Sequence, residues 1–230
     1  MNTVKPIKLI KLIKQLKLTE PTTTNTSIIP TTTNTETIPP DRIAKLKECF
    51  KISDINHDEN IMKELTLKDA HIYCTINNIS PQQAGCLIEK YIIIKNNLTK
   101  NNSSECIGDC SKDDKNTEIK VSLGGAKFKK FNYVQIRPSH NIDNYILTAF
   151  YLNALNIDKG GELYIFKVIK KDMISLILNF GSYAHGTLKE HGEITIEELN
   201  NKLNTKEYAL RPAYNDKCWK ALLQYRIQTI

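Results

Sequence analysis

The sequence predicts an α/β fold, with a mixed central β-sheet flanked by helices. Runs of β-branched and aromatic residues in the middle of the chain are typical of strands. Apolar residues at helical spacing occur both before and after this strand-rich region. One predicted strand, residues 117–123, alternates polar and apolar side chains, which places Glu118, Lys120 and Ser122 on one face.

The composition limits the class of protein. The 230 residues suffice for one domain plus a tail. No apolar run approaches the roughly 18 residues that a membrane-spanning helix requires. The net charge of +7 favours an anionic partner such as nucleic acid, although a general bias towards Lys, Asn and Ile also accounts for it.

The six cysteines lack the paired spacing of a zinc site. They therefore indicate a reducing, intracellular location, which we expect to be the cytoplasm. Cys49, Cys74 and Cys86 lie among apolar residues, and we expect their thiols to be buried.

Residues 1–40 are expected to lie outside the folded domain. Residues 1–18 carry regularly spaced lysines among Ile and Leu, which allows either a basic amphipathic helix or a solvated tail. Residues 19–40 are nearly all Thr, Asn and Pro, a composition typical of a disordered linker. The folded domain is therefore predicted to span residues 41–230.

Three helices are predicted at the start of this domain, over residues 41–50, 67–77 and 81–95. In the third, Ser80 can cap the helix, Pro81 suits its first position, and Gln83 completes a capping box. Glu89 lies among apolar residues of this helix, so it either faces a functional site or is an ordinary surface glutamate. His71, in the second helix, is expected to be a packed or surface residue.

The later elements follow from periodicity and turn residues. Gly124-Gly125 ends the strand at 117–123, and Gly181 ends a helix. Trp219, Leu222 and Leu223 are expected in the core or on a dimer surface. The strands predicted are 133–137, 145–152, 162–168 and 208–214, and the helices are 171–180, 196–203 and 217–226.

A hairpin provides the strongest indication of chemistry. Asp109 ends a short run, Cys106-Ile107-Gly108, and the turn-forming residues 111–116 separate it from the strand at 117–123. The hairpin can therefore bring Asp109 beside Glu118. Two carboxylates and a lysine suit Mg²⁺, which binds oxygen ligands and retains several waters, with Lys120 left to orient or activate a water. Such a group predicts metal-assisted phosphodiester hydrolysis.

The pattern Asp109…Glu118-x-Lys120 resembles that of the PD-(D/E)xK nucleases, and its context resembles type II restriction endonucleases over about residues 80–190. Gly108 stands where the family often has proline. The segments that add to the likeness are Glu89 in the preceding helix, Gln135-Ile136-Arg137, and Ala184-His185-Gly186-Thr187. The resemblance implies a restriction-endonuclease-like fold and Mg²⁺-dependent, sequence-specific cleavage of double-stranded DNA.

The resemblance also assigns roles. Asp109 and Glu118 would hold the metal, and Lys120 would position and activate the attacking water. Glu89 and Gln135 would support this catalytic group. The candidates for contacts with the DNA backbone are Arg137 and the lysines interleaved with aromatics, Lys127, Lys129 and Lys130, although these lysines could equally form a solvated run.

A homodimer is expected, because palindromic sites favour two-fold symmetry. A separate DNA methyltransferase is a possible partner, and no membrane is expected. Three alternatives stay open. They are a non-catalytic nucleic-acid-binding protein with a degenerate nuclease fold, a repair or junction-resolving nuclease, and a membrane-associated protein held by residues 1–18.

Overall fold

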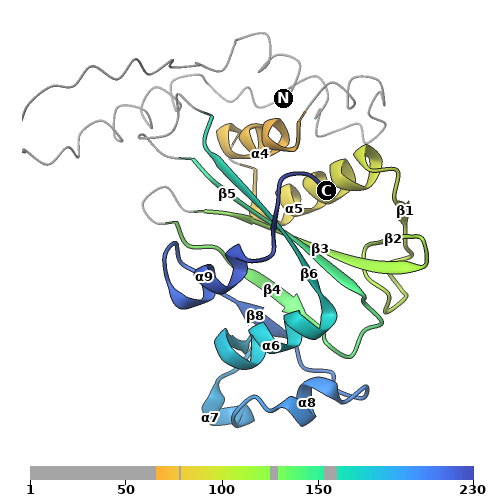
Figure 1. Cartoon of the computed structure of the whole chain (residues 1–230), viewed down its shortest axis with the longest axis vertical. Helices are drawn as coiled ribbons and strands as arrows, with labels where there is room; N and C mark the ends of the chain where they lie inside the picture. The colour runs from red at the N-terminus through yellow and green to blue at the C-terminus, as the bar shows by residue number, and fades with distance from the viewer. Residues whose placement is uncertain (1–65, 78, 125–128, 153–159) are drawn as a thin grey trace, which may run out of the picture.

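A computed structural model of the chain describes residues 66–77, 79–124, 129–152 and 160–230 (Figure 1). The predicted tail, the linker, the helix at 41–50, Cys49 and Lys127 lie outside these ranges. The described part is a mixed α/β arrangement, as predicted, with a central sheet between two groups of helices.

The central sheet has six strands in the order β1-β2-β3-β5-β6-β9. Strands β3 and β5 are parallel, and the other neighbours are antiparallel. The sheet is therefore mixed. Its strands are β1 Thr99–Lys100, β2 Cys110–Lys112, β3 Lys115–Leu123, β5 Asn144–Tyr151, β6 Glu162–Ile169 and β9 Arg226–Ile227.

Helices α4, Leu67–Ile76, and α5, Pro81–Lys95, cover one face of this sheet (Figure 1). The backbone N–H of Gln83 donates to Ser80 Oγ at 3.3 Å, so α5 begins where the sequence predicts. Its buried face packs on Ile119, Ile146 and Ile165 of the sheet. This packing fixes which residues of α5 reach the edge of β3.

His71 is fully buried between α4 and the sheet. One ring nitrogen lies 2.8 Å from Leu67 O and the other 3.0 Å from Thr148 Oγ1. Burial lowers the pKa of His71 to about 4, so the ring is neutral at pH 7. The expectation that His71 is a packed residue is confirmed.

The opposite face of the sheet is covered by a small second sheet and further helices. The second sheet has the order β4-β8-β7. Trp219 lies in this core, stacked on Phe131 at 5.1 Å and edge-on to Phe166 at 5.5 Å between ring centroids. The elements are β4 Tyr133–Ile136, α6 Lys170–Phe180, β7 Gly181–Tyr183, α7 Leu188–His191, α8 Ile196–Asn200, β8 Tyr208–Leu210 and α9 Lys217–Leu223.

Some sequence predictions are wrong in detail. No strand is predicted directly after the helix at 171–180, but Gly181–Tyr183 form β7, because they pair with β8. The Cys86 thiol is exposed rather than buried, because the side of α5 that carries it does not face the sheet. The expectation that Trp219, Leu222 and Leu223 lie in the core or on a dimer surface is confirmed for Trp219 and Leu222, which are in the core, whereas Leu223 is 40 % exposed. Among the described residues, no helix has the length and apolar character needed to cross a membrane.

Candidate active site at the edge of strand β3

The hairpin of β2 and β3 brings the Asp109 carboxylate to β3. Asp113 and Asp114 both have positive φ, 50° and 58°, which suits a two-residue hairpin turn. The backbone N–H of Asp109 donates to Thr117 O at 3.0 Å, which extends the pairing beyond β2. The backbone N–H of Ile119 then donates to Asp109 Oδ2 at 2.7 Å. The Asp109 carboxylate therefore accepts the hydrogen bond from β3 that a backbone carbonyl of a longer β2 would otherwise accept.

Gly108 makes this placement possible. Its φ is +83°, and a Cβ there would lie 2.8 Å from Thr117 O and 2.7 Å from Ile142 Cδ1. Proline, with φ fixed near −65°, cannot adopt this conformation. Glycine at this position is thus a requirement of the local backbone.

Glu118 and Lys120 form an ion pair next to Asp109. Lys120 Nζ lies 2.6 Å from Glu118 Oε1, and the two side chains are only 17 % and 14 % exposed, respectively. Ser122 follows on the same strand, is buried, and accepts a hydrogen bond from Asn132 N at 2.8 Å. The strand that the sequence predicts at 117–123 is confirmed.

Glu89 of α5 reaches the same group. Burial is the main cause that raises the pKa of Glu89 to about 7, and the negative charges of Asp109 and Glu118 add to it. Of the two readings of this glutamate, the structure therefore favours the one in which it faces the hairpin.

The pKa of Asp109 is raised as well, in part by the same neighbouring negative charge. Burial, followed by the charge of Glu118, raises the pKa of Asp109 to about 6, against the hydrogen bond from Ile119 N–H, which lowers it. Three carboxylates thus interact with one another at this edge, and a bound cation would relieve their repulsion.

A cleft of about 470 Å³ borders this group. Its walls are the N-terminal half of α5, residues 119–123 of β3 and residues 132–135. Among the described residues β3 has no strand partner on this side beyond Thr117, so its edge faces the cleft. Glu89, Lys120 and Gln135 all line the cleft. Asp109 and Glu118 are not among its lining residues, but they contact two that are, Ile119 and Lys120 respectively.

Arg137 is not among the residues that line the cleft. It follows the end of β4, and its Nε donates to Glu207 Oε1 at 2.8 Å. His185 Nε2 lies 3.4 Å from the other oxygen of Glu207. The prediction of a regular strand over residues 133–137 is wrong in detail, because the register of β4 shifts between Tyr133 and Ile136 and the strand ends at Ile136.

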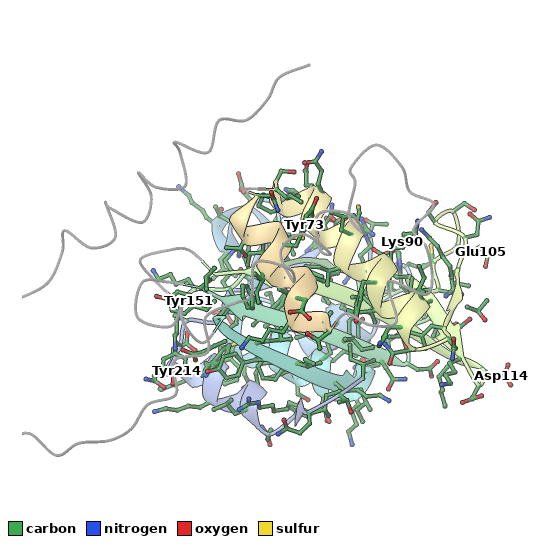
Figure 2. The ribbon with its side chains drawn as sticks, turned by 90° about the horizontal axis from the view of Figure 1, so that it is seen from above. Tyr73, Lys90, Glu105, Asp114, Tyr151 and Tyr214 are labelled. Atoms are coloured by element: carbon green, nitrogen blue, oxygen red, sulfur yellow. The ribbon has the colours of Figure 1, made fainter. Side chains whose placement is uncertain are left out.

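The lysines that the sequence predicts as contacts with the DNA backbone have different surroundings in the structure. Lys129 Nζ pairs with both oxygens of Glu162, at 2.8 and 2.9 Å, and lies 4.0 Å from the ring centroid of Tyr214 and 5.1 Å from that of Tyr151. Figure 2 shows Tyr151 and Tyr214 at the end of the molecule opposite the hairpin turn at Asp114. Lys129 therefore lies at the end of the molecule away from the hairpin turn, while Lys130 is exposed on the same segment.

Two basic residues near the site were missed by sequence reasoning. Lys100 in β1 lowers the pKa of both Glu89 and Asp109, and the loop residue His140 interacts electrostatically with Glu118 and Lys120. Both reach the site through tertiary structure, since β1 pairs with β2 and the loop joins β4 to β5. Neither lies in a sequence motif.

The carboxylates fit Mg²⁺ as ligands. In the described part of the chain, no three His, Cys, Asp or Glu side chains form a ready metal-binding group. Mg²⁺ does not require one, because it is commonly bound through one or two carboxylates while it retains waters. Asp109 and Glu118 each use one oxygen within the protein, for Ile119 N–H and for Lys120, which leaves Oδ1 and Oε2 for a cation.

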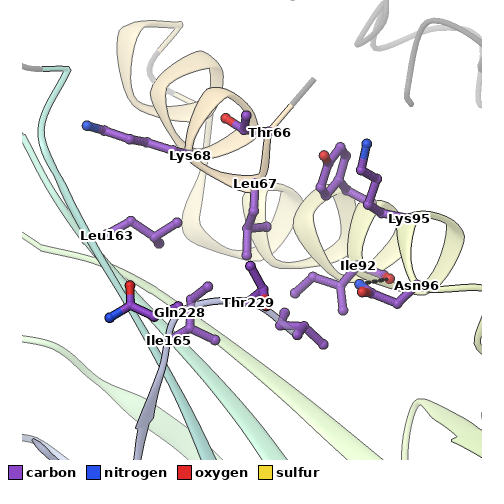
Figure 3. Close-up of a pocket in the computed structure, with 12 residues that line it drawn as sticks. Thr66, Leu67, Lys68, Ile92, Lys95, Asn96, Leu163, Ile165, Gln228 and Thr229 are labelled. Carbon is purple, nitrogen blue, oxygen red and sulfur yellow. Dashed lines mark hydrogen bonds between the residues drawn. The ribbon is translucent and has the colours of Figure 1, made fainter. Parts of the chain in front are cut away.

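A second cavity, of about 540 Å³, lies between α4, α5, β6 and the C-terminal segment (Figure 3). Ile92 and Ile165 form part of its apolar lining. No Asp, Glu, His or Cys side chain lines it. Although larger than the cleft, it offers no carboxylate, imidazole or thiol for metal binding, and its titratable lining residues are Lys68, Tyr91 and Lys95.

Comparison of this chain with protein-family models, with curated proteins and with solved structures gives no match.

Proposed function

We propose that this protein is a Mg²⁺-dependent endodeoxyribonuclease that hydrolyses phosphodiester bonds of double-stranded DNA at specific sites, as type II restriction endonucleases do. The observation that carries the proposal is the convergence of Asp109, Glu118 and Lys120 at one strand edge, through the Ile119–Asp109 hydrogen bond and the Glu118–Lys120 ion pair. A carboxylate pair with a lysine, next to a cleft, suits metal-assisted hydrolysis.

Each side chain has a role in the proposed reaction. Asp109 and Glu118 hold the metal, which, when bound, supplies positive charge for the phosphate and acidifies a water. Lys120 orients the attacking water and is itself oriented by Glu118. Glu89, with a pKa raised to about 7, is suited to accept or give a proton within the cleft that it lines.

The test is incubation of supercoiled plasmid with the purified protein, with MgCl₂ or with EDTA. Discrete linear products are expected only with Mg²⁺. The variant Asp109→Asn is expected to cut at least about a hundred-fold more slowly, because it loses a ligand charge. The matched control Asp114→Asn, in the exposed turn of the same hairpin, is expected to cut normally.

Other outcomes identify the alternatives. Salt-sensitive DNA binding without any Mg²⁺-dependent product would indicate a non-catalytic nucleic-acid-binding protein. Preferential cleavage of branched DNA would indicate a junction-resolving or repair nuclease. A protein that cuts a palindromic duplex is also expected to be a two-fold dimer on it, which light scattering of the complex measures.

A further inference from the structure

Strand β4 contains a backbone irregularity where it borders the cleft. Gln135 has φ = 56°, and the pairing register shifts between Tyr133 and Ile136. A residue other than glycine is uncommon in this region of φ, and holding it there costs on the order of 1 kcal/mol. The strain is thus located at a residue that lines the proposed active-site cleft.

The irregularity has a clear effect on side-chain direction. In a regular strand, residues three apart face opposite sides. Here Tyr133 and Ile136 are both buried in the same core, 1 % and 0 % exposed, and Gln135 is exposed beside the cleft. The left-handed backbone therefore allows the two apolar side chains to share the core and turns Gln135 outward.

The packing of Tyr133 and Ile136 explains why the backbone bends at position 135, but it does not explain why the residue there is a glutamine. Glycine adopts positive φ without a steric penalty, and Asn tolerates it better than longer side chains do. A purely structural bulge would be formed at lower cost by either. The carboxamide on its longer stem is the feature that glutamine adds.

Two further carboxamides line the same cleft. Asn132 is anchored to β3 by the hydrogen bond from its backbone N–H to Ser122 Oγ, and Gln82 lies in the first turn of α5. Like Gln135, both are exposed. Each carboxamide presents a donor and an acceptor side by side. The rim of the cleft is therefore suited to bind a group, such as the edge of a base, that also has a hydrogen-bond donor next to an acceptor.

We propose that Gln135 determines sequence specificity by reading an adenine next to the phosphate that is cut. In the major groove adenine presents the N7 acceptor beside the N6 amino donor, the pattern that a glutamine carboxamide complements in a bidentate manner. The inference rests on the proposed function, since it places a backbone phosphate of the duplex at the cleft that Glu89 and Lys120 line.

Cleavage of a randomised duplex pool tests this assignment. Sequencing of the ends cut by the wild type is expected to show one position strongly enriched in adenine. In Gln135→Gly, which accepts the positive φ and removes the carboxamide, that enrichment is expected to fall about 5- to 150-fold, as for loss of one bidentate base contact. Thermal stability should be equal or higher, because the strain is removed.

The matched control is Asn215→Gly, which removes a carboxamide from another exposed residue of positive φ, 70°, outside the cleft. It should retain the adenine preference. An unchanged preference in Gln135→Gly, or a wild-type site without adenine, would overturn the inference while the nuclease proposal stands.

Selection of bound duplexes in EDTA separates this inference from the nuclease proposal. If the wild type cuts nothing but its bound pool is enriched in adenine, and Gln135→Gly loses that enrichment, the base-reading role holds and the nuclease proposal fails. A wild-type protein with neither cleavage nor base preference would contradict both.

Discussion

The backbone N–H of Ile119 donates a 2.7 Å hydrogen bond to the Asp109 carboxylate, ten residues earlier in the chain. This bond holds Asp109 against the edge of β3, where its charge interacts with that of Glu118. Burial and the neighbouring carboxylate disfavour the ionised form of Asp109 by more than this hydrogen bond favours it. The arrangement is therefore typical of a functional site.

The Glu118–Lys120 pair is expected to be important for stability. Lys120→Met leaves the poorly exposed Glu118 without its partner beside a second carboxylate, and should lower the free energy of unfolding by about 2–3 kcal/mol. The double variant Glu118→Gln/Lys120→Met should recover most of this loss, because no unpaired charge remains. Urea denaturation measures both, and equal losses in the single and double variants would contradict the pairing.

Glu89 is expected to make stability pH-dependent in metal-free buffer. Its pKa is raised from 4.5 to about 7, so its contribution to stability is complete below about pH 4.5 and is lost as the pH rises through 7. Glu89→Gln should leave Tm unchanged at pH 4.5 and raise it by a few degrees at pH 8, corresponding to about 1 kcal/mol after allowance for solvent screening.

Thermal melts in EDTA across this pH range measure that difference. The exposed residue Glu105, labelled in Figure 2, provides the matched control Glu105→Gln, for which no pH-dependent change is expected. A Glu89→Gln protein whose Tm follows the wild type at every pH would show that Glu89 is not under electrostatic strain.

Mg²⁺ is expected to stabilise the folded protein most at alkaline pH. Protons compete with the cation for Asp109, whose pKa is about 6. At a Mg²⁺ concentration a hundred times its Kd, the gain should be about 2.7 kcal/mol at pH 8. The gain should be smaller at pH 5.5 and largely absent in Asp109→Asn. A rise in Tm that is equal in both proteins would place the cation elsewhere.

Gly108→Ala is expected to displace Asp109. The new Cβ would meet backbone and side-chain atoms at 2.7–2.8 Å in a conformation with positive φ, so a loss of roughly 2–3 kcal/mol is expected. Gly192→Ala shares the conformation, with φ = +81°, but has open space around the position, and should cost only about 1 kcal/mol. Equal losses would mean that the close approach at Gly108 is unimportant.

Much of this site could be predicted from the sequence because it depends on local pattern. The turn residues around Asp113 and the alternation at 117–123 suffice to pair the hairpin and to place Asp109 beside β3. The start of α5 followed from Ser80 and Pro81, which act on their own helix.

The rest depends on contacts between distant segments. The shift in β4 is imposed by the core that buries both Tyr133 and Ile136, so periodicity alone wrongly predicted a regular strand. The partners of Arg137 and Lys129 are Glu207 and Glu162, residues far along the chain whose proximity no short motif encodes.

The most direct test of the proposed mechanism is the single-turnover rate of duplex cleavage by Lys120→Met, compared with Lys112→Met on the exposed end of the neighbouring strand β2. We expect Lys120→Met to cut at least about a hundred-fold more slowly with DNA affinity retained, and Lys112→Met to cut at the wild-type rate. Equal rates for Lys120→Met and the wild type would contradict the assignment of the active site to the edge of β3.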